Sequence, residues 1–474
     1  MTIINVRDLG ARGDDQTDNT TAIQQALDRA SEQSATVLVP PGRYRSGTLF
    51  VRSDTTLELT AGATLVGPTR WEQFIPVVSP NPEAEWERVR RHFLVVQDAE
   101  RVTIKGRGTI DGQGWHWCDA GATPESWHRG KDPRPDVMVA VIRSRDVVIE
   151  GVRLSDPPNW NLDLFCSDRV RVQGVTIASD PRLPNNDGID ISGSSDVIIS
   201  DCQIHVGDDG IVLNGRSRPV RRVAVSNCVI SSECAALKVG WENTRNDITQ
   251  VAFANCILSG CNRGLACYSG NGAVIEDVVA SNLVLDSNAP IMFARPIHLD
   301  LRRGNDTGTF GAIRRIQVSN LVARTQGRIL LTSEDGGALE DITLRDVSLA
   351  YPYLEDAEPI ADDNRSSQFS NANRAARRAR AAVVAEHVRG LSVDNLRLAW
   401  PGAEVPADWQ IPAKRENGGT RIFRPDYTQP RPCAFNALWG RDVQGWWRSP
   451  AALASASATA RFDLDPASRL QVSE

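Results

Sequence analysis

Short stretches that alternate apolar and polar residues recur along this chain. Each has two apolar residues separated by one residue, then two linking residues, and then a second apolar pair with the same spacing. The copies begin at Val102 (a shorter one), Val147, Val170, Val197, Val223, Val251, Val278, Ile316, Ile342 and Leu391. Between Val147 and Val278 they begin 23 to 28 residues apart. A period of this size is typical of a solenoid, in which stacked units share one continuous core.

The same pattern indicates the type of secondary structure. Alternation with period two predicts strands with one set of side chains turned inward. The second linking residue is usually Gly, Asn or Asp, the residues that best tolerate a left-handed turn. Helical solenoids need long stretches with a period of 3.6, which the repeats lack. The sequence therefore predicts an all-β fold, a parallel β-helix.

The pattern also divides the chain into regions. Residues 1–70 are expected to form an N-terminal cap with the first coils. This cap includes a helix over Thr21–Ala30, with Asn19 or Thr20 at its start and an apolar stripe of Ile23, Ala26 and Leu27. Residues 71–400 form the body of the solenoid, interrupted by insertions near 112–136 and 351–385. From 401 to 474 the period fades, which predicts an irregular C-terminal cap packed on the body.

Composition narrows the possible partners. The net charge of −6, with both signs mixed, argues against a nucleic-acid partner. No apolar run of 18 residues occurs, so no membrane span is expected. The N-terminus lacks a signal segment, which favours a cytoplasmic protein or a trimmed form of a secreted one. Oligomeric state stays open.

Nine cysteines are present, an odd number. Cys202, Cys228 and Cys256 occupy one position in successive repeats, where other repeats have Val or Leu. They are therefore predicted to be small core residues. Metal-ligand spacings are absent, so neither a metal nor another cofactor is expected.

Three acidic residues follow the repeat in register. Asp187 lies in Asn185–Ile191, and Asp208 and Asp209 lie in Gly207–Leu213. If Ile189 aligns with Ile211, then Asp187 stacks on Asp209, and strands about 4.8 Å apart crowd three carboxylates together. Crowding raises the pKa of one of them, and glycoside hydrolysis needs one protonated carboxyl beside a carboxylate. Each motif alone is typical of a turn, and clustered carboxylates can bind calcium, but their shared register favours catalysis.

At these motifs the chain resembles the polygalacturonase family, glycoside hydrolase family 28. The matching segments are Asp111–Trp115, Pro158–Trp160, Asn185–Gly188 and Gly207–Asp209. The resemblance covers about residues 1–400 and implies a right-handed parallel β-helix and hydrolysis that inverts the anomeric centre. It also implies that Asp208 is the general acid, and that Asp187 and Asp209 hold the attacking water.

Two family motifs are not found where they are expected. Cys234–Ala236 stands at the position of Gly-His-Gly, and Gly264–Ala266 stands at the position of the Arg-x-Lys that grips a galacturonate carboxylate. We therefore expect a pectic oligosaccharide substrate but not standard polygalacturonase action. The residues predicted to bind the substrate are Asn186, Asp190, Lys238, Trp160, Trp241, Arg263, Arg295 and His298. Trp115, Trp117 and Trp127 are further candidate platforms for a sugar face.

Other interpretations remain open from sequence. A lyase or epimerase on the same fold would need a basic residue, for which Lys238 is a candidate. A carbohydrate-binding β-helix without catalysis has no need for three stacked acids. Long insertions that block one end of a groove favour exo action, and the missing clamp favours rhamnose or another non-uronate as the released sugar.

Overall fold

The fold is a right-handed parallel β-helix, and the structure is a computed structural model. It describes residues 2–78, 89–119, 126–127, 130–241, 243–288, 294–304, 308–352, 379–400, 407–409, 415–416, 436–449 and 462–473. The chain divides into two compact units. Unit 1 comprises Met1–Val212, Arg222–Ile230 and Glu416–Gly418, and unit 2 comprises Leu213–Arg221, Ser231–Arg415 and Gly419–Glu474.

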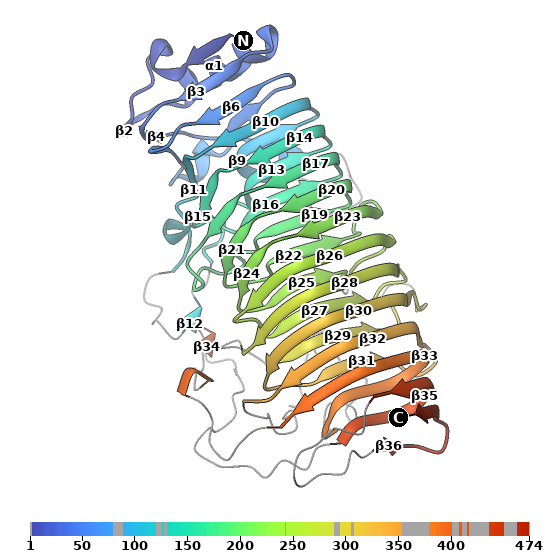
Figure 1. Cartoon of the computed structure of the whole chain (residues 1–474). Coiled ribbons are helices and arrows are strands. Elements are labelled where there is room, and N and C mark those ends of the chain that lie inside the picture. Colours follow the sequence, from blue (N-terminus) through green and yellow to red (C-terminus); the bar gives the residue numbers. More distant parts are fainter. Residues whose placement is uncertain are drawn as a thin grey trace. The chain divides into compact units, whose positions relative to one another are not determined.

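Unit 1 is built from three parallel sheets, and each coil contributes one strand to each sheet (Figure 1). The first sheet contains β3 (Thr36–Val39), β6 (Thr56–Leu59), β10 (Glu100–Gly106), β14 (Arg145–Glu150), β17 (Asp168–Gln173) and β20 (Ser195–Ser200). The second contains β4 (Gly42–Arg45), β7 (Ala63–Val66), β11 (Thr109–Asp111), β15 (Arg153–Ser155), β18 (Thr176–Ala178) and β21 (Gln203–Val206). The third contains β5 (Leu49–Val51), β9 (Val89–Gln97), β13 (Val137–Ile142), β16 (Trp160–Phe165) and β19 (Ile189–Ser192).

Further elements belong to the described chain. They are β1 (Ile3–Asn5), η1 (Val6–Leu9), β2 (Asp14–Asp18), η2 (Trp71–Gln73), β8 (Pro76–Val78), η4 (Gly114–Trp117), β12 (Ser126–Trp127), β22 (Ile211–Asn214), β23 (Val220–Ser226), β24 (Val229–Ser232), η6 (Ala407–Trp409) and β34 (Arg415–Glu416).

The repeats stack in register, which produces the core. Val147 pairs with Val170 and Val170 with Val197 along the first sheet, and all three side chains are buried. Each strand is too short to bury its own apolar face, so the interior exists only because successive coils cover one another. Cys202, Cys228 and Cys256 are each 1% exposed, which confirms that they are core residues.

The second linking residue adopts the left-handed conformation in both units. The φ angle is +72° at Gly151, +61° at Gly174 and +58° at Asp201 in unit 1. In unit 2 it is +55° at Asn282 and +51° at Asn320. The left-handed turn predicted from these residue types is therefore confirmed.

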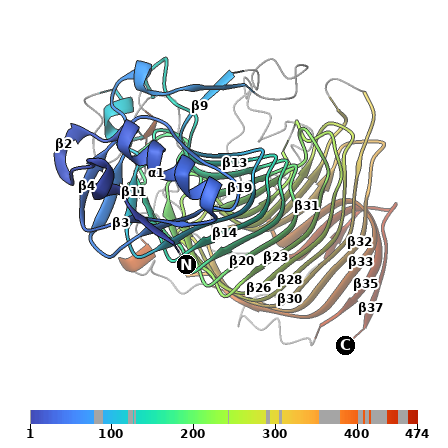
Figure 2. The ribbon, with the colours of Figure 1, turned by 90° about the horizontal axis from the view of Figure 1, so that it is seen from above.

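The predicted helix is α1 (Thr20–Gln33), which packs against β3 and β5 at the N-terminal end of unit 1 (Figure 2). Its buried residues are Ile23, Ala26, Leu27 and Ala30, which include the whole predicted stripe. Asn19 takes the N-cap position, but its side chain bonds to backbone atoms of Arg12, Thr17 and Arg45 and not to the helix. No helix in the described part of the chain is long and apolar enough to cross a membrane.

Unit 2 is also built from parallel strands, several of which are longer than those of unit 1. One series is β25 (Ala235–Val239), β27 (Arg263–Ser269), β29 (Arg295–Leu301) and β31 (Ile329–Ser333). The other is β26 (Ile248–Ser259), β28 (Val274–Ser287), β30 (Ala312–Thr325) and β32 (Leu339–Ala350). A single long strand, β33 (Ala381–Ala399), pairs with both β31 and β32.

The tail beyond residue 401 contributes regular strands as well. β35 (Asn436–Arg448) pairs in parallel with β33, and β36 (Phe462–Leu464) and β37 (Arg469–Ser473) pair with β35. This part of the predicted irregular cap thus extends the stack. Within the predicted insertions, residues 120–125, 128–129 and 353–378 lie outside the described residues.

The linking asparagines of unit 2 generate a prediction about stability. Asn282 donates a side-chain hydrogen bond to Asn255 at 2.9 Å and accepts one from Asn320 at 3.0 Å. Asn282→Gly should lower the free energy of unfolding by about 0.5–1.5 kcal/mol per lost hydrogen bond. Asn282→Val should cost roughly 1–2 kcal/mol more, because a β-branched residue resists the left-handed conformation. Urea unfolding measures both, and equal stability of the two variants would contradict this account of the turn.

Candidate active site

The three acids of the sequence motifs lie at neighbouring strand ends in unit 1. Asp187 precedes β19, and Asp208 and Asp209 lie between β21 and β22. Gly188 N donates to Asp209 O at 2.9 Å, and Ile189 N donates to Gly210 O at 3.0 Å. In a parallel ladder these bonds set Asp187 opposite Asp209, which is the register that the repeats predict. Asp187 and Asp209 are 7% and 3% exposed, and Asp208 is half-buried.

The side chain of Asn186 holds the loop that carries two of the acids. Its Oδ1 accepts hydrogen bonds from Gly207 N and Asp208 N, both at 2.9 Å, and its Nδ2 donates to Asp180 O at 2.8 Å. Asn186 is fully buried, so the structure gives it a positioning role that the sequence did not indicate. A Cβ at Gly207 would lie 2.0 Å from Pro181 O, which explains the glycine before the paired acids.

A second amide supports Asp187 from the preceding coil. Asn161, on β16, donates through Nδ2 to Asp187 O at 3.0 Å and accepts a hydrogen bond from Ser179 Oγ at 3.1 Å. Its side chain is completely buried. Sequence reasoning missed Asn161, although it directly follows the Pro158–Trp160 segment that carries part of the family resemblance.

Arg134, on the first insertion, brings a positive charge to the acids. Its guanidinium donates to the side chain of Asn185 and to Pro184 O. Burial lowers the pKa of Arg134, and the negative charges of Asp187 and Asp208 oppose that shift, so both acids lie within its electrostatic reach. A guanidinium in this position offsets part of the repulsion among the carboxylates. No signal in the sequence distinguished Arg134 from other surface arginines.

The aromatic candidates of unit 1 differ in how far their side chains are exposed. Trp117 is 5% exposed, packs edge-on against Phe74 and donates to Pro68 O, so the prediction that it stacks on a sugar is wrong. Trp115 is 40% exposed, with the Arg182 guanidinium 4.8 Å from its ring centroid. Trp160 is half-buried at the start of β16. The side chain of Trp127 lies outside the described residues.

Asp190 lies within the third sheet of unit 1. It pairs in register with Asp163 of β16, and both side chains are buried. The two carboxylates therefore follow one column of the sheet, just beyond the coil end where Asp187 lies.

The other predicted ligand residues belong to unit 2. Arg263, Arg295 and His298 are 2%, 2% and 3% exposed. Arg263 pairs with Arg295 across β27 and β29, and both side chains are enclosed. Lys238 is 3% exposed, and its Nζ lies 3.1 Å from the centroid of the Trp241 ring.

These buried groups are joined by hydrogen bonds that the sequence could not indicate. Arg263 donates to Asn262 Oδ1 at 2.8 Å and to the Tyr268 hydroxyl at 3.3 Å. The Tyr268 hydroxyl lies 2.8 Å from His298 Nδ1, and Arg295 Nη1 lies 3.3 Å from the same nitrogen. Because arginine can only donate, His298 Nδ1 acts as the acceptor.

The segment aligned with Arg-x-Lys is packed closely. A Cβ at Gly264 would meet Pro296 O at 2.6 Å, and Ala266 is fully buried against Ala235 and Tyr268. Neither position leaves room for a long cationic side chain.

Comparison with known proteins identifies relatives across most of the chain. The model of the family described as glycosyl hydrolases family 28 matches residues 31–366. A probable polygalacturonase from Vitis vinifera is 28% identical over 331 residues, which cover 67% of this chain and 60% of that protein. An exo-poly-alpha-D-galacturonosidase from Dickeya chrysanthemi is 25% identical over 329 residues, covering 60% of this chain and 50% of that protein. The chain thus spans half to three fifths of the length of these two relatives.

A solved structure resembles the fold. The exopolygalacturonase from Thermotoga maritima superposes with a TM-score of 0.62 at 22% identity, covering 84% of this chain and 92% of that one. At this level of identity the likeness supports the β-helix architecture alone.

The loop held by Asn186 yields a prediction. Asn186→Leu keeps a similar size but leaves Gly207 N and Asp208 N without their acceptor, at a cost of about 1–3 kcal/mol for each buried donor. We expect lower stability in urea unfolding and a loss of hydrolytic rate, because Asp208 is no longer held. Asn186→Asp retains the acceptor oxygen and serves as the comparison. If the leucine variant were as active as the aspartate variant, the positioning role would be excluded.

Proposed function

The chain belongs to glycosyl hydrolases family 28, and from this membership we propose that it is an inverting, exo-acting glycosidase of pectic oligosaccharides. The observation that carries the proposal is the set of three acids, Asp187, Asp208 and Asp209, held at adjacent strand ends by backbone and Asn186 contacts. A β-helix gains no stability from carboxylates gathered in this way.

The roles of the three acids follow from the chemistry of inversion. Asp208 protonates the oxygen of the leaving group, while Asp187 and Asp209 bind and deprotonate the attacking water on the opposite face of the sugar. Two features of unit 1 support this assignment. Asp208 is the most exposed of the three acids, and Asp187 and Asp209 lie opposite each other in the ladder, as a shared water requires.

Exo action has its own support. The name of one relative, the Dickeya chrysanthemi protein, describes an exo-acting enzyme. In unit 1 the insertion near 112–136 brings Arg134 onto the loop of Pro184 and Asn185, beside the acids. A segment in this position limits how far a polymer can extend past the site.

The lyase or epimerase alternative is less well supported. Its candidate base is Lys238, and the ammonium of that residue lies over the Trp241 ring. The side chain is 3% exposed and its Nζ lies 3.1 Å from the ring centroid, so it would have to leave this contact to reach a sugar.

Substitution of the acids tests the mechanism. Asp187→Asn, Asp208→Asn and Asp209→Asn should each reduce kcat by about 10²–10⁴-fold, the usual contribution of general acid–base catalysis. The fold should persist, since asparagine keeps the shape of each side chain. Asp146→Asn, which removes an exposed carboxylate paired with Arg169, serves as the control and should leave kcat unchanged. Normal turnover in any of the three variants would remove that residue from the mechanism.

The products of a pectic oligosaccharide of defined length test exo action and inversion together. We expect a single sugar and an oligomer shortened by one residue at early times, with the first-formed anomer inverted in the proton NMR spectrum. A ladder of intermediate oligomers with rapid loss of viscosity on a polymer would rule out exo action. Retention of configuration would overturn the roles given to Asp187 and Asp209.

A further inference from the structure

The base of the first insertion holds Arg134 in a defined place beside the candidate site. Cys118 and Gly130 form an antiparallel bridge, and Lys131 N donates to Trp117 O at 2.9 Å. A Cβ at Gly130 would lie 2.7 Å from Nη1 of Arg134, so the guanidinium packs directly against this glycine. These contacts restrict where the Arg134 side chain can lie.

The same guanidinium joins the insertion to the turn that carries Asp187. Its Nη2 donates to Asn185 Oδ1 at 2.5 Å, and its Nη1 donates to Pro184 O at 3.2 Å. Asn185 has a φ angle of +53°, so a residue in the uncommon left-handed region is held by a side chain from another segment. The next residue is Asn186, which holds the backbone of Asp208, so the places of both acids depend on this turn.

Arg134 also places a positive charge near these two acids. The negative charges of Asp187 and Asp208 oppose the lowering of its pKa by burial, so both carboxylates lie within its electrostatic reach. Asp136 and Cys118 face it as well. Burial raises the pKa of the Cys118 thiol to about 11, so this group is uncharged at neutral pH. Arginine itself stays protonated over the whole range in which carboxyl groups titrate.

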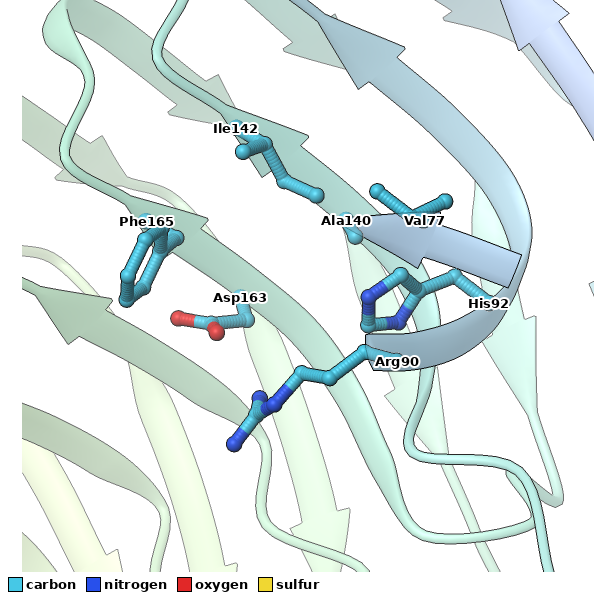
Figure 3. A pocket seen from close by; sticks show the side chains of 7 residues that line it. All are labelled: Val77, Arg90, His92, Ala140, Ile142, Asp163 and Phe165. Carbon is cyan, nitrogen blue, oxygen red and sulfur yellow. The ribbon is translucent and has the colours of Figure 1, made fainter. Parts of the chain in front are cut away.

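Asp136 has a second cation beside it. Burial raises the pKa of Asp136, and the charges of Arg90 and Arg134 oppose that shift, with Arg90 having the larger effect of the two. Arg90, from β9, lies with Asp163 at the small hollow of Figure 3, and its guanidinium is 5.8 Å from the centroid of the Trp160 ring. Replacing Arg134 therefore leaves a cation near Asp136, and the change in charge should act mainly on the acids.

We propose that Arg134 is a positioning residue of the candidate site, which holds the Asn185 turn and sets the pH range in which Asp187 is ionised and Asp208 is protonated. A positive charge favours the ionised form of every nearby carboxyl group. It therefore lets Asp187 act as a base at lower pH, and it also makes Asp208 lose its proton at lower pH. Both limbs of a bell-shaped pH profile consequently lie at lower pH than they would without Arg134. This inference rests on the proposed function, which gives the acids their roles.

Removal of the charge should move the whole pH profile. Arg134→Met keeps an unbranched side chain without charge, and both limbs of the kcat/KM profile should shift to higher pH by about 0.5–1 pH unit at low ionic strength. The shift should shrink in about 0.5 M salt, because ions screen charges that are not in direct contact. Loss of the two hydrogen bonds should also lower kcat at the optimum by about 3- to 10-fold. Arg134→Lys retains the charge and should keep both limbs close to their wild-type positions.

Arg169→Met is the matched control. Arg169, on β17, pairs with the exposed Asp146, so its loss changes the net charge equally without touching the loop of the acids, and both limbs should stay in place. If Arg134→Met lowers kcat but leaves the limbs unmoved, its role is only structural and the inference is wrong. Equal shifts in the two variants would show an effect of net charge and would also overturn it. Should urea unfolding show that Arg134→Met is not folded, Arg134→Gln, which retains a donor for Asn185, takes its place with the same expected shift.

A titration without substrate separates this inference from the proposed function. Carbon-13 NMR of protein labelled at the aspartate carboxyl groups follows each acid directly, with Asp187→Asn and Asp208→Asn used to assign the signals. We expect both titration midpoints to move to higher pH in Arg134→Met. If the midpoints move while the wild type cleaves no glycoside, the glycosidase proposal fails and the electrostatic role of Arg134 stands. If the wild type hydrolyses pectic oligosaccharides and the midpoints do not move, the glycosidase proposal stands and this inference fails.

Discussion

In-register pairing of parallel strands between successive coils is the constraint on which the rest of this structure depends. Each strand is short, so both its hydrogen bonds and its apolar cover come from the coil before and the coil after it. Register is kept because the linking residue takes the same left-handed conformation in coil after coil, as at Gly151, Asp201 and Asn282. A slip of one residue would turn every inward side chain outward.

The same register makes the candidate site chemically useful. Stacking sets Asp187 opposite Asp209, and the structure compensates for the resulting repulsion locally. Buried amides of Asn161 and Asn186 hold the backbone and the loop, and the charge of Arg134 lies nearby. The fold therefore supplies the periodic spacing. One residue of a strand, Asn161, and two residues between strands, Arg134 and Asn186, supply the groups that stabilise three close carboxylates.

Charged side chains are enclosed in both units. In unit 1, Asp187 and Asp209 lie at strand ends and are 7% and 3% exposed. His92 of β9 is 2% exposed, and burial lowers its pKa to about 3. In unit 2, Arg263 and Arg295 are enclosed together with Tyr268 and His298. The exposure expected of each residue type taken alone would not indicate this arrangement.

The sequence by itself determined the coil period, the left-handed turns, the helix stripe and the register of Asp187 on Asp209. These features depend on the alternation of apolar and polar residues and on the residue types in the turns. Both can be read from one strand and its linking residues. Only the tertiary structure decided the burial of Trp117, the place of Arg134 and the surroundings of His92. Arg134 meets Pro184 and Asn185 across 50 and 51 residues of sequence, and His92 meets Asp163 across three strands. No periodic pattern encodes the Arg134 contacts, because they arise where an irregular segment folds back on the regular stack. His92 and Asp163 are both on regular strands, but alternation does not show which outward-facing side chains become buried.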